Sequence, residues 1–180
     1  MNAALIRWLA AIIMAMVCAV SFADELSGQA KEKFIGKWDR NAGTVSFFVK
    51  EIGGKKQARM LLVDERVDDV LSKLSVEMAS GELDDLGDLI RDSLAELETP
   101  DSQVANISPL GNKETRKEIG RLIYPEGKLI LVMVNPGDTR KYVSMSMKMK
   151  DKRFQYAYWM EKEDLVLLRK LIDKTLLSLE

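Results

Sequence analysis

Three methionines alternate with polar residues in the segment Met145-Ser-Met147-Lys-Met149. Thioether sulfurs are soft ligands that select Cu(I), so this spacing makes a Met-rich Cu(I) carrier one alternative for the protein. Methionine also fills irregular gaps in hydrophobic cores and packs well against aromatic rings. We expect core packing of these three side chains, because a hairpin of strands 143–149 and 154–160 would place them opposite aromatic residues.

The same hairpin supplies a candidate partner surface on its polar side. This surface gathers cations, an amide and an indole, namely Lys148, Lys150, Arg153, Gln155 and Trp159. Such a patch suits phospholipid head groups, anionic glycans or an acidic protein surface. The alternative is an ordinary solvent-facing side of a sheet, or a side that another part of the chain covers.

Two residue types that carry much of enzyme chemistry are scarce. The chain has no histidine, and its one cysteine is Cys18. Because the chain has no histidine, catalytic Ser-His-Asp and Cys-His sites are excluded. Zinc sites built on thiolate or imidazole are excluded in the part of the chain that follows Cys18. The chain also lacks a nucleophile elbow and a phosphate-binding loop, so we predict no catalytic residue, cofactor or metal ligand. A hydrolase that uses a pair of carboxylates remains the enzymatic alternative.

Residues 1–23 have the pattern of a cleavable secretory signal peptide. A basic start at Arg7 is followed by a run without charge over 8–20 and then by small residues before a cleavage site between Ala23 and Asp24. A membrane-spanning helix needs about 20 apolar residues, which is more than this run offers. We therefore expect export to the periplasm, with secretion to the outside as the alternative, and no transmembrane segment after cleavage.

Charge is distributed unevenly along the remaining chain. Residues 64–101 carry 13 acids and three bases, whereas residues 113–153 carry 11 bases and five acids. Asp84, Asp88 and Asp92 are spaced four apart, so they repel one another if this region is helical. Docking to a basic partner or weak Ca²⁺ binding would use such a face, but a solvated helix face explains it more simply.

The chain separates into β-rich and α-rich stretches. We expect a short helix around residues 30–35 and then a hairpin whose turn is Gly53-Gly54. Helical spacing of apolar residues over 67–78 and 83–97 predicts a helix pair joined at Gly81. Residues 99–113 are rich in Pro, Ser, Asn and Gly and are expected to form a long surface loop, with a short helix after Asn112.

The C-terminal part reads as a β-meander and a helix. Turn sequences at 124–127 and 135–138 flank a continuously apolar strand at 129–134. In the hairpin that follows, one register places all large apolar residues on one side, through the pairs Met149–Phe154, Met147–Tyr156, Met145–Tyr158 and Val143–Met160. Residues 161–179 then show the buried stripe of an amphipathic helix.

These elements predict one α+β domain over residues 24–180. It has an antiparallel β-sheet, made of the N-terminal hairpin and the C-terminal meander, with an inserted helix pair and a C-terminal helix packed on one face. We expect an exported, non-enzymatic binding or accessory protein that acts through a protein or envelope surface. Nucleic acid is not an expected partner, and the sequence leaves the oligomeric state and the identity of the partner open.

Overall fold

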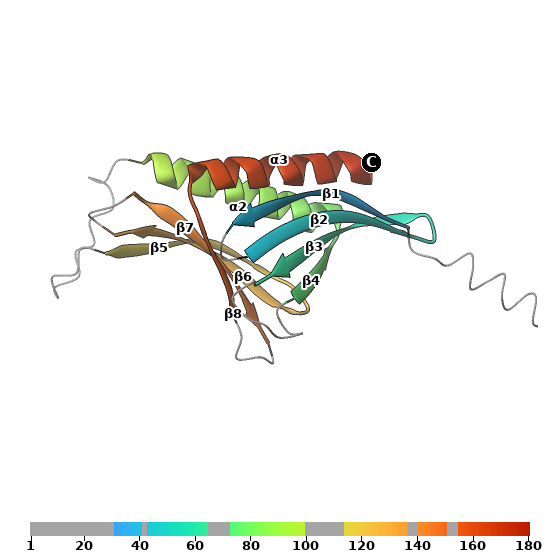
Figure 1. The fold of residues 1–180 in the computed structure, drawn as a ribbon, viewed down its shortest axis with the longest axis horizontal. Coiled ribbons are helices and arrows are strands. Elements are labelled where there is room, and N and C mark those ends of the chain that lie inside the picture. The colour runs from blue at the N-terminus through green and yellow to red at the C-terminus, as the bar shows by residue number, and fades with distance from the viewer. Residues whose placement is uncertain (1–30, 41–42, 65–72, 100–113, 137–139, 151–154) are drawn as a thin grey trace, which may run out of the picture.

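The computed structural model describes residues 31–40, 43–64, 73–99, 114–136, 140–150 and 155–180. The expected signal peptide, the pair Met149–Phe154, Arg153 and all of the 99–113 loop except Thr99 lie outside these residues or depend on residues outside them. Within the described residues, the chain is an α+β protein with eight strands and two helices (Figure 1).

The strands form two antiparallel sheets of four, and not one sheet as the sequence predicted. Sheet A is a meander of β1 (Lys31–Arg40), β2 (Gly43–Ile52), β3 (Lys55–Val63) and β4 (Lys73–Met78), followed by helix α2 (Ser80–Glu98). Sheet B repeats this order with β5 (Thr115–Ile123), β6 (Gly127–Asn135), β7 (Tyr142–Met149) and β8 (Gln155–Met160), followed by helix α3 (Lys162–Leu179).

Several predicted elements are confirmed. The hairpin at Gly53-Gly54 joins β2 to β3, and both glycines adopt the positive φ that this turn requires. The register of the last hairpin is also confirmed, because Val143 pairs with Met160, Met145 with Tyr158 and Met147 with Tyr156. The C-terminal helix is α3, and both helices lie in one layer on the same side of the sheets (Figure 1).

The predicted helix pair is wrong in its first member. Residues 73–78 form strand β4, in which Leu74, Val76 and Met78 alternate with polar residues and point into the core. Leu74 and Met78 are four residues apart, so they fit a helical spacing as well as a strand spacing. Pairing with β3 decides between the two, because only the strand buries Val76 beside Met60. The rest of the predicted helix, residues 67–72, lies outside the described residues.

Two further short helices are replaced by strands. Residues 31–35 belong to β1 and not to a helix, and the chain is extended from Thr115 onwards, where a helix after Asn112 was expected. Both strands contain a β-bulge, between Phe34 and Gly36 in β1 and between Glu118 and Gly120 in β5. Each bulge disturbs the strict alternation of a strand, so Ile35 and Trp38 are both buried although they are three residues apart.

The two halves of the chain are structurally equivalent. Each consists of four strands and a helix, and the registers match pair by pair: Phe47–Met60 in sheet A corresponds to Leu131–Met145 in sheet B. The helices match as well, since Ser93 and Thr175 each donate a hydroxyl hydrogen bond to the carbonyl four residues earlier, at 2.8 and 2.7 Å. The sequence analysis did not detect this internal repeat, although the two helices share an identical apolar stripe: Leu83, Leu86, Leu89, Ile90, Leu94 and Leu97 correspond to Leu165, Leu168, Leu171, Ile172, Leu176 and Leu179.

Each helix packs mainly on the sheet of the other half. Helix α2 lies against β5 and β6, whereas α3 lies against β1 and β2. A glycine permits each approach: a Cβ on Gly120 would lie 2.4 Å from a methyl carbon of Leu89, and one on Gly36 would lie 2.5 Å from a methyl carbon of Leu171. The two helices are antiparallel, because Glu98 at the end of α2 pairs with Lys162 at the start of α3.

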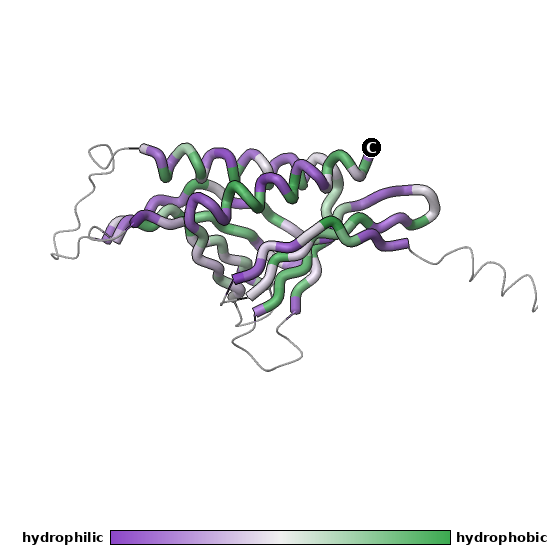
Figure 2. Tube along the Cα trace, turned by 45° about the horizontal axis from the view of Figure 1, so that its top comes forward, coloured by the Kyte–Doolittle hydropathy of each residue, from purple (hydrophilic) through white to green (hydrophobic). Residues whose placement is uncertain are grey.

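One core fills the space between the helices and the inner faces of both sheets. Aromatic residues from both halves meet there, for example Trp38 and Tyr158, whose rings pack edge to face at 5.6 Å. Along the strands, hydrophobic and hydrophilic residues alternate, as the coloured trace shows (Figure 2). This alternation leaves the outer faces of the sheets, away from the helices, as the polar surfaces of the molecule.

Candidate functional site

The outer face of sheet B contains the described members of the sequence-predicted partner surface. The register forms transverse rows across the four strands, and one row contains Ile123, Lys128, Lys148 and Gln155 in that order. Ile130 and Val132 lie further along β6 and are half-buried. Strand β6 therefore has one deeply buried face and one partly open face, and is not covered on both faces as its apolar sequence suggested.

Three lysines surround a shallow hollow of about 260 Å³ at one end of this face. We call it the lysine hollow and define it by its lining residues, Ile123, Gly127, Lys128, Lys148, Met149 and Lys150. Ile123 is 75% exposed, which makes it the most exposed of the large hydrophobic residues among those described. The hollow therefore combines three ammonium groups with an aliphatic side chain that no other part of the described chain covers.

Two of these lysines face each other directly. Lys128 on β6 and Lys148 on β7 are register partners on the same side of the sheet. Like charges in such a position destabilise a sheet, because the Cβ atoms of opposite residues lie about 5 Å apart. Within the described residues, the side chains of Lys128, Lys148 and Lys150 form no ion pair or hydrogen bond. The local arrangement thus concentrates positive charge without neutralising it.

Neighbouring cations on sheet B are neutralised. Arg116 pairs with Glu114 at 2.6 Å, Lys117 with Glu96 at 2.6 Å, and Arg121 with Glu118 at 2.7 Å. The Glu114 carboxylate also raises the pKa of Arg116. The unpaired charge on this face is therefore localised at the lysine hollow and not spread over the whole sheet.

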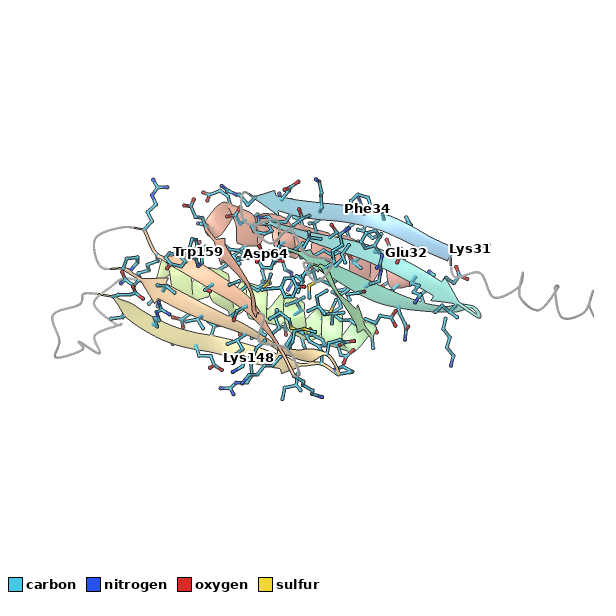
Figure 3. All side chains as sticks on the ribbon, turned by 60° about the horizontal axis from the view of Figure 1, so that its bottom comes forward. Lys31, Glu32, Phe34, Asp64, Lys148 and Trp159 are labelled. Atoms are coloured by element: carbon cyan, nitrogen blue, oxygen red, sulfur yellow. The ribbon has the colours of Figure 1, made fainter. Side chains whose placement is uncertain are left out.

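Trp159 lies at the other end of the face and not among the lysines as predicted. It pairs with Ser144, four residues along β7 from Lys148, which corresponds to about 13 Å. Figure 3 shows Lys148 and Trp159 well apart on the sheet. Trp159 is 65% exposed and its ring packs against Tyr142, with 6.3 Å between the centroids. The predicted surface therefore divides into a basic end and an aromatic end.

The equivalent outer face of sheet A has a different character. Two of its cations are paired with carboxylates, Arg59 with Glu32 at 2.6 Å and Lys50 with Glu77 at 2.9 Å. Arg59 also lies over the ring of Phe48, with 4.5 Å from its guanidinium carbon to the ring centroid. These ion pairs neutralise two cations of sheet A. We place the candidate site on sheet B because the facing side chains of Lys128 and Lys148 have no ion pair among the described residues.

The methionine motif lies mainly in the core. Met145 and Met147 are each 1% exposed and pair with Tyr158 and Tyr156, as core packing predicted. Only Met149, which is half-buried, reaches the lysine hollow. The sulfurs of Met145 and Met147 therefore have no access to an ion from solvent.

The acidic helix face is partly neutralised. Asp88 in the middle of α2 forms an ion pair with Arg91 at 2.9 Å and lies 4.0 Å from the guanidinium of Arg169 on α3. This removes the central charge from the predicted repulsive row of Asp84, Asp88 and Asp92. Among the described residues, no group of three or more acidic, His or Cys side chains is arranged to hold a metal ion.

Ionisable groups elsewhere give little support for acid–base chemistry. Burial raises the pKa of the Tyr124 hydroxyl, and the nearby charges of Glu82, Asp85 and Glu126 raise it further. Burial and then Asp64 raise the pKa of Tyr156. Both shifts keep the phenol protonated at neutral pH and make it a weaker nucleophile.

One hollow contains two carboxylates, as the hydrolase alternative requires. It lies at the start of α3 and is lined by Leu97, Arg140, Lys141, Glu161, Lys162 and Glu163. Lys162 forms an ion pair with Glu98, and Lys141 donates a hydrogen bond to the carbonyl of Thr99 at 2.6 Å. The hydrolase remains an alternative prediction.

Sequence analysis missed three residues of the candidate site: Ile123, Lys128 and Tyr142. A signal for them was present, because the turn sequences at 124–127 and 135–138 were recognised. Extending the register from β7 across these turns places Lys128 opposite Lys148 and Ile123 beside Lys128. The missing step was to treat the outer faces of all four strands as one surface.

Comparison of the chain with models of known protein families and with curated proteins finds no match. Among the described residues, neither helix is long and apolar enough to cross a membrane.

The copper alternative predicts that the buried sulfurs contribute to metal affinity, and we expect that they do not. The double variant Met145→Leu/Met147→Leu should bind Cu(I) as the unmodified protein does, in a competition titration with a chromogenic chelator. Its free energy of unfolding should change by less than about 1.5 kcal/mol per substitution, because leucine and methionine have similar volumes. A clear loss of Cu(I) affinity in a variant that remains folded would restore the copper carrier as a candidate.

Proposed function

We propose that this protein is an exported, non-enzymatic binding or accessory protein of the bacterial periplasm that acts through the outer face of sheet B. The single observation that carries the proposal is the set of lysines on that face that have no ion-pair partner among the described residues, beside the strongly exposed Ile123. An isolated protein gains no stability from like charges placed opposite each other, so a negatively charged partner is the simplest reason for the arrangement.

The proposed working surface includes the residues predicted from sequence, Lys148, Lys150, Arg153, Gln155 and Trp159, and extends to Ile123, Lys128 and Tyr142. Its two ends differ in chemistry. The basic end offers electrostatic attraction, which accelerates encounter with an anionic partner and falls with ionic strength. The aromatic end offers Trp159 and Tyr142, residue types that are enriched where proteins contact partners.

The proposal of export depends on the N-terminal residues, which combine a basic start, an uncharged run and a small-residue cleavage site. The protein isolated from its native cells should begin at Asp24 and occur in the periplasmic fraction, as measured by N-terminal sequencing. A chain that still begins at Met1 and is recovered from the cytosol would contradict export and with it the envelope partner.

Charge reversal tests the partner surface. The variant Lys148→Glu/Lys150→Glu/Arg153→Glu should lose most of the crosslinked products that the unmodified protein forms in native envelopes, and high salt should have the same effect. The matched control is Lys33→Glu/Lys55→Glu/Lys56→Glu, which changes the net charge equally at exposed positions of sheet A. The products should be analysed by mass spectrometry and compared between the two variants. Equal loss in both variants, or crosslinking that is insensitive to salt and to both variants, would reject the sheet B surface.

A further inference from the structure

We propose that the lysine hollow binds the anionic head groups of a phospholipid surface, with Ile123 inserted among the lipids. The inference rests on the proposed function and names the partner of the same surface. It starts from the composition of the hollow, in which every charged lining side chain is a lysine and the most exposed residue is aliphatic.

The choice of lysine favours a lipid surface over a protein surface. Lysine is depleted in the cores of protein interfaces, where aromatic residues, methionine and arginine are enriched. Carboxylates of an acidic protein are recognised best by the planar fork of arginine, and Arg116 and Arg121, the arginines of this face within the described residues, are already paired with glutamates. Lysine acts as a mobile point charge, which suits a layer of head groups without fixed geometry.

The placement of the hollow also suits a surface that approaches from one side. Ile123, the last residue of β5, and Lys150, directly after β7, lie at the same end of sheet B. The backbone N–H of Lys150 donates to the carbonyl of Glu126 at 3.2 Å, which ties these two strand ends together. The lysine stems can lie along apolar surface while their ammonium groups reach phosphates, and Ile123 projects beside them.

Among the described residues, the acid nearest in sequence to the hollow does not neutralise it, and Asp151, next to Lys150, lies outside the description. Glu126 lies in the turn between β5 and β6, and no ion pair joins it to Lys128, Lys148 or Lys150 within the described residues. One oxygen of its carboxylate is buried without a hydrogen-bond partner. Its negative charge instead raises the pKa of Tyr124, on the core side of the strand end.

The test is flotation of the exported protein with vesicles, using variants that all share one N-terminus. Vesicles of phosphatidylcholine with about 30 mol% phosphatidylglycerol should bind the protein, and pure phosphatidylcholine vesicles should not. The variant Lys128→Gln/Lys148→Gln/Lys150→Gln should bind on the order of 100-fold more weakly, since each lysine near an anionic surface contributes about fivefold. The matched control Lys33→Gln/Lys55→Gln/Lys56→Gln should bind within about threefold of the unmodified protein.

Two more measurements distinguish loss of the binding site from loss of folding stability. The single variant Lys148→Gln should keep or raise the thermal unfolding midpoint while it weakens vesicle binding, because it removes a like-charge pair from the sheet. Ile123→Ser should weaken the binding that persists at high salt. A fall in the midpoint that accompanies the loss of binding would show that the lysines are structural and would overturn the inference.

The inference is also overturned if the control triple loses as much affinity as the hollow triple, or if anionic vesicles are not bound. In the second case the proposed function can survive independently. Crosslinking to an acidic envelope protein that depends on Lys148 and Lys150 would then identify a protein as the partner and reject the lipid surface.

Discussion

The structure depends on one packing constraint: each helix must bury its apolar stripe on the sheet that belongs to the other half of the chain. Gly36 and Gly120 ease both contacts, because a Cβ there would lie 2.5 or 2.4 Å from a leucine methyl carbon, which would have to move. Asp164 on α3 strengthens this arrangement, in which each helix covers the sheet of the other half; we call the arrangement the exchange of helices. Asp164 accepts hydrogen bonds from the Trp38 ring nitrogen at 3.0 Å and the Arg40 guanidinium at 2.8 Å, and both donors lie on β1. Neither sheet therefore has its full cover without the opposite half.

The same constraint determines where function can reside. Both helices are used on the inner side of the sheets, so no described helix covers either outer face. The core positions of the two halves remain alike, but their outer faces have diverged. The pair of Lys128 and Lys148 in sheet B corresponds to Thr44 and Val63 in sheet A, and the exposed Trp159 corresponds to Glu77. The two halves therefore differ in the chemistry of their outer faces, while both keep hydrophobic residues in the core.

Much of the fold could be predicted where the local pattern and the tertiary environment agree. The last hairpin and the C-terminal helix belong to this group, because Tyr156, Tyr158 and Met160 alternate strictly and the helix keeps its apolar stripe. Prediction failed at β1 and β4 for physical reasons. The bulge at Ile35 breaks the alternation of β1, and the residues at 74 and 78 suit both kinds of element until a neighbouring strand selects one.

The candidate site was predictable in part. Lys148 and Trp159 follow from the register of a single hairpin, but their separation and the approach of Lys128 and Ile123 depend on how four strands align. Local sequence patterns could not predict which sheet each helix packs on, because the two sheets present similar inner faces. The sequence signals of a repeat were the matched glycines at 36 and 120 and at 43 and 127, and the identical apolar stripe of the two helices.

The exchange of helices is tested most directly by cutting the connection between the halves. A protease site placed within residues 100–113 of the full chain allows cleavage after folding, followed by size-exclusion chromatography in native buffer. Because each half supplies the helix that covers the other, the two fragments should elute together as one species of the original size. Separation into two fragments that each retain their strands and helix would contradict the exchange, and with it the explanation of why the outer face of sheet B is free for a partner.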